Sequence, residues 1–121
     1  MTSDLAGQIK ANFEQVEAGE WSERERIWLT FYLSGPPVDL ERLGRVLASN
    51  KWVNLGGWEG AFLYPKIEVK RARDAVIEAA IAAETLCAEH GVDLIAIDAD
   101  TNPEVQSSHF TTLYRNLGEG V

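Results

Sequence analysis

Few side chains in this sequence could do chemistry, and none of them completes a known motif. The run Asp98–Asn102 (DADTN) matches the first five positions of a calcium-binding loop. The match ends there, because Pro103 replaces the required glycine and His109 replaces the glutamate of the twelfth position. We therefore expect no metal ion, and we interpret these acidic residues as charges at the end of a strand.

Histidine and cysteine are too scarce for a zinc site, since the chain has two histidines and one cysteine. His109 follows Ser107 and Ser108, but neighbouring positions do not supply the geometry of a nucleophile and its base. Cys87 is expected to be a small buried hydrophobe, and His90 to lie at the C-terminus of a helix. The sequence thus predicts no catalytic residue, no cofactor and no enzymatic activity.

The charge of the chain restricts its partners. Nineteen acidic and eleven basic residues give a net charge of −8, which disfavours direct nucleic-acid binding because phosphate contacts need Lys and Arg. Between Arg73 and Arg115 there are eight acidic residues and no basic one. This acidic part could steer the molecule toward a basic partner, or it could simply keep the surface hydrated.

The 121-residue length predicts a single domain with a real core. No apolar run is long enough to span a bilayer, and the N-terminus has no secretory pattern. With a single cysteine, no disulfide can form within the chain. We therefore expect a cytoplasmic protein that does not contact a membrane.

Hydrophobic periodicity predicts the elements that position these residues. A helix is expected over 3–18, because Leu5, Ile9, Phe13 and Val16 fall on one face. The other predicted elements are a strand in RIWLTFYLS, a helix capped by Asp39, strands in NKWVNL and AFLYPKIEV, a helix over 71–90 with Val76, Ile77, Ala80, Ile81 and Cys87 inward, and a strand in VDLIAIDA.

This order predicts an α+β domain with a ferredoxin-like βαββαβ antiparallel sheet and an additional N-terminal helix. Residues 1–25 would form the helix and a connector, 26–100 the ferredoxin-like core, and 101–121 a C-terminal segment. GGWEG (56–60) would be the loop of a hairpin between the second and third strands.

Side-chain alternation places two sets of residues on opposite faces of the predicted sheet. Ile27, Leu29, Phe31 and Leu33 would face the helices. Aromatic residues would gather on the other face as a candidate sheet-face site or pocket: Trp28, Tyr32, Phe62 and Tyr64. Such a face needs a cover, either the chain's own termini, a second copy, another protein or a ligand.

The run from Ile27 to about Asp100 resembles the family of the bacterial regulator of ribonuclease activity B, an inhibitor of ribonuclease E. The segment YLSGPPVDLERLGRVLASNKW is similar to that family's strand, polar stop, leucine-spaced helix and aromatic end. LCAEHGVDL is similar to its last helix running into the final strand. The resemblance implies a ribonuclease as the partner. It transfers no functional residue, since IDAD stands where the family's last strand ends differently.

The first functional hypothesis is therefore a non-catalytic, acidic regulator that binds another protein, such as a ribonuclease, and inhibits it. Trp52 and Trp58 would be apolar anchors, and Asp98 and Asp100 the charges that occupy a basic groove. The alternative is a homodimeric ferredoxin-like protein with an aromatic cavity. Such a protein would bind a small molecule or act as a cofactor-independent oxygenase.

Overall fold

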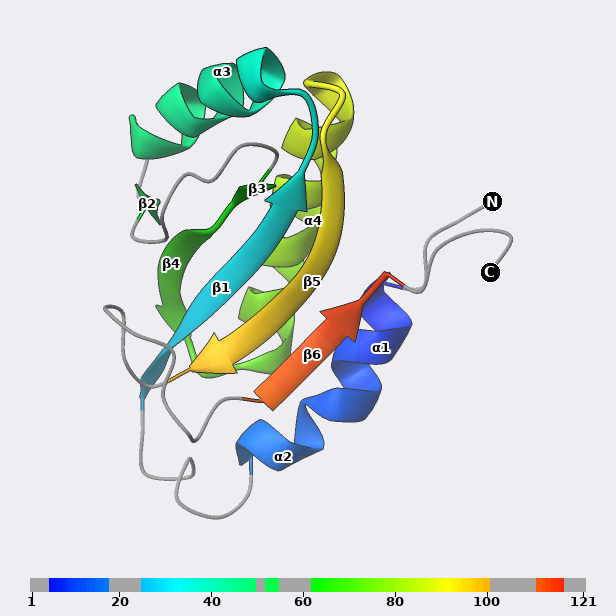
Figure 1. Cartoon of the computed structure of the whole chain (residues 1–121). Helices are drawn as coiled ribbons and strands as arrows, with labels where there is room; N and C mark the ends of the chain where they lie inside the picture. Colours follow the sequence, from blue (N-terminus) through cyan, green and yellow to red (C-terminus); the bar gives the residue numbers. More distant parts are fainter. Residues whose placement is uncertain (1–4, 18–24, 50–51, 55–61, 101–110, 117–121) are drawn as a thin grey trace.

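The computed structural model describes residues 5–17, 25–49, 52–54, 62–100 and 111–116 (Figure 1). Its helices are α1 (Leu5–Asn12), α2 (Glu14–Glu17), α3 (Pro37–Ala48) and α4 (Arg73–Glu89). Its strands are β1 (Arg26–Ser34), β2 (Val53–Asn54), β3 (Phe62–Leu63), β4 (Pro65–Lys70), β5 (Asp93–Asp100) and β6 (Thr111–Arg115). None of the described helices is long and apolar enough to cross a membrane.

The protein is an α+β structure with one antiparallel sheet in the order β2-β4-β1-β5-β6. β3 lies beside β1 as well, and it continues into β4. Leu33 pairs with Leu63 and Thr30 with Lys66 in one unbroken register, so the predicted third strand is a single extended segment. The pairing with β1 is interrupted at Tyr64 and Pro65, and proline has no amide hydrogen to donate.

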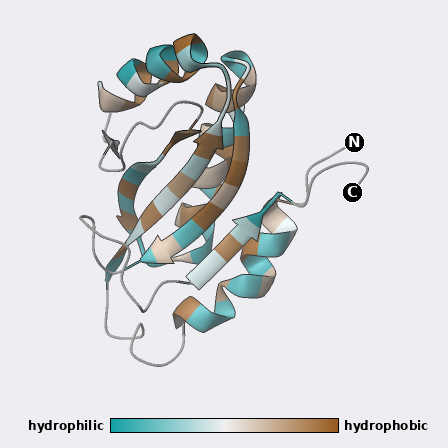
Figure 2. Cartoon of the chain, viewed as in Figure 1, coloured by the Kyte–Doolittle hydropathy of each residue, from teal (hydrophilic) through white to brown (hydrophobic). Residues whose placement is uncertain are grey.

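β1 is the centre of the sheet, and its alternation divides the molecule into two faces. Ile27, Leu29 and Phe31 are completely buried and Leu33 is nearly so, which confirms the predicted core side of this strand. Figure 2 shows the alternation as hydrophobic bands along β1. Burial of each such side chain contributes about 1.5–3 kcal/mol. α3 and α4 supply further residues of this core: Leu40, Leu43 and Leu47 of α3, and Val76, Ala80, Ala83 and Cys87 of α4.

The predicted N-terminal helix is confirmed in its apolar face but is divided in two. Leu5, Ile9, Phe13 and Val16 are all buried, as their spacing predicted. α1 ends before Phe13, and α2 follows as one short turn. The guanidinium of Arg73 at the start of α4 lies over the Phe13 ring, 5.8 Å from its centroid.

The C-terminal segment forms β6 and extends the sheet, which the sequence did not predict. α1 runs beside this edge strand (Figure 1). Gln8 donates to the carbonyl of Arg115 and accepts from its amide, and Asn12 donates to the carbonyl of Leu113. The helix therefore satisfies backbone groups that an edge strand would otherwise expose.

Two predictions about the helices are wrong. α3 begins at Pro37 with Pro36 at the N-cap, not after Asp39, because proline is favoured in the first helical turn. Ile81 of α4 is 48% exposed. The inward face of α4 follows Val76 and Ala80, and Ile81 lies about 100° around the helix from that face.

The end of α4 is built as the sequence predicted. His90 is the C-cap residue, and its Nδ1 lies 2.9 Å from the carbonyl oxygen of Leu86. Gly91 has a φ of +68°, a left-handed conformation that favours glycine. The amide of Val92 donates to the carbonyl of Cys87 over 2.9 Å, which completes a Schellman motif and turns the chain into β5.

Gly91→Ala should lower the free energy of unfolding by about 1–2 kcal/mol, because a Cβ is disfavoured in the left-handed region. The space itself is open, since the nearest atom to an added Cβ outside neighbouring residues is 3.7 Å away. Urea unfolding measures the change. The control is Gly7→Ala on the exposed side of α1, which should raise stability by about 0.5–1 kcal/mol. Equal effects at both glycines would contradict this account of the turn.

Candidate functional site

The sheet surface opposite α3 and α4, here called the outer face, carries the candidate site. It faces the viewer in Figure 1, with α4 behind the sheet. Trp28, Thr30 and Tyr32 of β1 project onto it, since they alternate with the residues of that strand that face the helices. The described parts of both termini lie elsewhere: α1 flanks β6, and β6 extends the edge of the sheet. Within the described residues, therefore, the termini do not cover this face, which was one of the four alternatives that the sequence left open.

Three aromatic rings form a wall on the outer face. Tyr32 and Tyr64 meet nearly edge to face, with ring centroids 5.5 Å apart and planes at 67°. Phe62 and Tyr64 are parallel within 6°, with centroids 6.4 Å apart, because they are two residues apart on one strand. Phe62 remains 44% exposed. We call Tyr32, Phe62 and Tyr64 the aromatic wall.

An open pocket of about 380 Å³ lies against the aromatic wall. Its floor follows from the register: Ala96 of β5 is opposite Tyr32 on one side and Arg115 on the other. A methyl group between two long side chains leaves a hollow on the sheet surface. The complete lining is Tyr32, Phe62, Tyr64, Ile95, Ala96, Asp98, Thr112 and Arg115.

Asp98 supplies a carboxylate to this pocket. It is only 5% exposed, and the Tyr32 hydroxyl donates a hydrogen bond of 2.8 Å to its Oδ2. Thr30 and Thr112 are its neighbours on the two adjoining strands. A carboxylate held in a poorly hydrated place acts on nearby charges more strongly than one in water.

Arg115 supplies a positive charge to the same pocket. Its backbone is fixed by the two hydrogen bonds to Gln8, of 3.1 and 3.2 Å, while the residue itself is exposed. The helix α1 therefore positions the strand that presents this guanidinium. Opposite charges from neighbouring strands β5 and β6 thus line one hollow with an aromatic wall.

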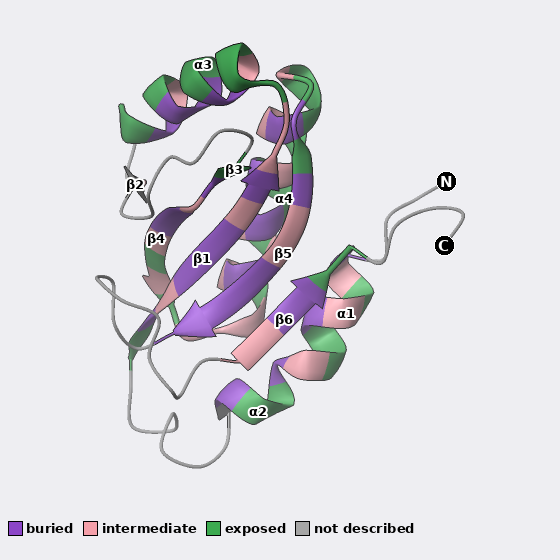
Figure 3. Ribbon diagram, viewed as in Figure 1, coloured by how far each residue is buried: buried purple, intermediate pink, exposed green. Residues whose placement is uncertain are grey.

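The residues that the sequence proposed for a sheet-face pocket share one face. Tyr32, Phe62 and Tyr64 line the pocket, whereas Trp28 lies farther along β1, between Glu68 and Asp100. Figure 3 shows partly buried residues among the buried ones of β1, whereas the arrowhead end of β5 is buried throughout.

The residues proposed as partner contacts are placed differently. Asp98 and Asp100 are 5% and 0% exposed, so neither presents its charge on the surface. Trp52 is half-buried on the core side and meets the ring of Phe31 nearly edge to face, with centroids 4.8 Å apart. Trp58 lies outside the described residues.

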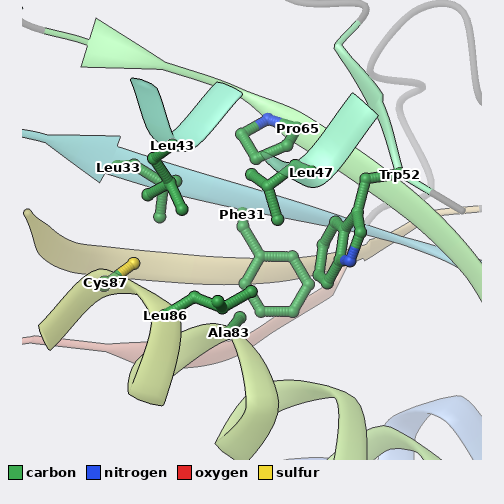
Figure 4. A pocket seen from close by; sticks show the side chains of 9 residues that line it. All are labelled: Phe31, Leu33, Leu43, Leu47, Trp52, Pro65, Ala83, Leu86 and Cys87. Atoms are coloured by element: carbon green, nitrogen blue, oxygen red, sulfur yellow. The ribbon is translucent and has the colours of Figure 1, made fainter. Parts of the chain in front are cut away.

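Trp52 also borders a second cavity, between α3, α4 and the sheet (Figure 4). Its lining is apolar, and its volume of about 10 Å³ is at most enough for one water molecule. Cys87 on this lining is buried, which raises the pKa of its thiol from 9.0 to about 12, with the charges of Asp93 and Glu84 adding to the effect. A thiol with so high a pKa is no nucleophile near neutral pH. This cavity is a packing defect of the core and not a ligand site.

Sequence reasoning missed four residues of the pocket: Ile95, Ala96, Thr112 and Arg115. Ala96 has no chemical signal of its own, because only its position between long neighbours matters. Thr112 and Arg115 lie on a strand that was not predicted, although TTLYR has the β-branched and aromatic content of one. Across the described part of the chain, no three His, Cys, Asp or Glu side chains gather as a metal site would require.

Comparison of the chain with protein-family models, with curated proteins and with solved structures gave no match.

Tyr32→Phe should lower the free energy of unfolding by about 1.5–3 kcal/mol, because the buried carboxylate of Asp98 loses a hydrogen-bond donor. Chemical denaturation of both proteins measures the difference. The matched control is Tyr64→Phe: among the described residues no hydrogen bond involves the Tyr64 hydroxyl, so its removal should change stability by about 0.5 kcal/mol or less. Similar losses of unfolding free energy for both variants would show that the Tyr32–Asp98 hydrogen bond does not contribute measurably to stability.

Proposed function

We propose that this protein binds a small molecule in the outer-face pocket. The observation that carries the proposal is the pocket itself: about 380 Å³, with an aromatic wall, one carboxylate and one guanidinium. Small-molecule sites are typically hollows of about 300–1,000 Å³, mostly apolar, with a few placed polar groups. The cavity found among the described core residues is far smaller, at about 10 Å³.

Buried polar groups on the outer face, of which Asp98 lines the pocket, support the same proposal. Thr30, Lys66, Asp98 and Asp100 are all 5% exposed or less, although they belong to the face away from the helices. Burying a charged group is unfavourable unless it is compensated, and the Tyr32 hydroxyl compensates Asp98 at the edge of the pocket. Polar groups held out of water next to an aromatic hollow are a common feature of binding sites.

We further infer that the core is ferredoxin-like, as the order of elements predicted. Two observations support this. β1 and β2 are connected through α3 and flank β4, and β4 and β5 are connected through α4 and flank β1. Each unit is thus a split βαβ, in which an antiparallel strand lies between two parallel ones. β6 and α1 are additions at one edge.

A regulator that binds another protein is the second candidate, and the outward face of α4 favours it. This face carries acidic residues and one exposed apolar side chain: Asp74, Glu78 and Glu89 share it with Ile81. A basic partner would be attracted to it, as the resemblance to ribonuclease inhibitors implies. This version uses α4 in place of Asp98 and Asp100, which are buried.

The ligand proposal is tested with indole as a simple aromatic probe. Titration followed by backbone amide NMR should shift Ala96, Thr112 and Arg115, because these residues line the pocket. Ala96→Leu fills the floor and should weaken binding at least about tenfold. Ala82→Leu, on the exposed side of α4, is the control and should leave binding unchanged. Indole shifts that are confined to the core or to α4 would refute the proposal.

The regulator candidate predicts salt-sensitive capture of one protein from a nuclease-treated lysate of the source organism. Raising ionic strength from about 0.1 to 1 M shortens the Debye length from about 10 to 3 Å and should release that protein. Glu78→Lys should reduce capture, and Glu14→Lys on α2 should not. The proposal that the partner binds the outward face of α4 would be contradicted if capture persisted at high salt, or if both substitutions weakened capture equally.

A further inference from the structure

We infer that the outer-face pocket selects a zwitterionic aromatic molecule of the amino-acid type, with its ring on the aromatic wall, its ammonium near Asp98 and its carboxylate at Arg115. The inference rests on the proposed function and names the ligand class of the same site. Its basis is that one hollow is lined by rings, by a carboxylate and by a guanidinium together.

The aromatic wall specifies a flat ring. Phe62 and Tyr64 are parallel within 6°, and Tyr32 stands at 67° to Tyr64, so the wall combines parallel faces with a ring edge. Aromatic pairs prefer offset-stacked or edge-to-face contacts, and this wall provides partners for both. The methyl floor at Ala96 leaves depth for a planar group between the wall and Arg115.

Asp98 specifies a cation. Its carboxylate is 5% exposed, and its attraction for an ammonium is therefore weakened little by water. The neighbouring rings of Tyr32 and Tyr64 add to this preference, because the face of an aromatic ring attracts a cation. A simple aromatic carboxylate would meet repulsion here.

Arg115 specifies an anion. A guanidinium presents several N–H donors in a plane that matches a carboxylate. Its backbone is held between β5 and the amide of Gln8, so the guanidinium starts from a fixed point beside the floor. A simple aromatic amine would meet repulsion at this side. A ligand with both signs meets an opposite charge on each side of the hollow and is repelled at neither side.

Three ligands with one indole ring test this inference on the full chain: tryptophan, tryptamine without the carboxylate, and indole-3-propionate without the ammonium. Titrations followed at the amides of Ala96 and Arg115 give the dissociation constants. Tryptophan should bind at least about tenfold more tightly than either analogue, since each analogue loses one charged contact and keeps one repulsion.

Arg115→Gln identifies the carboxylate contact without altering a buried residue. In this variant tryptophan and tryptamine should have dissociation constants within about a factor of two, because the guanidinium that distinguishes the two ligands by their carboxylate has been removed. Arg45→Gln, on the exposed side of α3, is the matched control and should preserve the full ratio.

The outcomes separate the two proposals. Equal binding of all three ligands at the pocket, or tightest binding of either single-charge analogue, would overturn the zwitterion inference and leave the pocket in place. Absence of binding by indole and by all three ligands would overturn the proposed function itself.

Discussion

The structure depends on the register of one central strand. β1 pairs with β4 on one side and β5 on the other, and its side chains alternate strictly between the core and the outer face. A slip of one residue would place Tyr32 among the leucines of the core and expose Phe31. Such a slip would be unfavourable by many kcal/mol, because burial of each core side chain of β1 contributes about 1.5–3 kcal/mol to stability. The same constraint that builds the core therefore builds the site.

The outer face holds the polar side chains that would be unfavourable in the apolar core. Polar groups and a hollow occur together there: Asp98 lies against Tyr32, and Ala96 lies between Tyr32 and Arg115. Tyr32 has two roles, since its ring belongs to the aromatic wall and its hydroxyl satisfies the carboxylate. Removing water from a carboxylate is unfavourable without such a donor. The wall and the charge beside it are consequently one cooperative unit.

Much of the fold can be predicted from the sequence, and there is a physical reason why the rest of the pocket cannot. Alternation in RIWLTFYLS predicts both faces of β1, and the apolar spacing of residues 5–16 predicts the N-terminal helix. The pocket floor is different, because Ala96 becomes a floor only through its cross-strand neighbours. Arg115 depends likewise on a strand held by Gln8, more than a hundred positions away in the chain. Asp98 was expected to be an exposed charge that contacts a partner, but it is buried, because a sequence gives the charge of a residue and not its exposure.

The most direct test of the central claim is to locate a bound aromatic ring by intermolecular nuclear Overhauser effects. Indole, at saturating concentration, should give cross-peaks between its ring protons and the Ala96 methyl group, with further cross-peaks to the ring protons of Tyr32 and Tyr64. These contacts would place the ring on the floor and against the wall. Cross-peaks from indole only to α3 or α4 side chains, such as Leu86, would contradict the account.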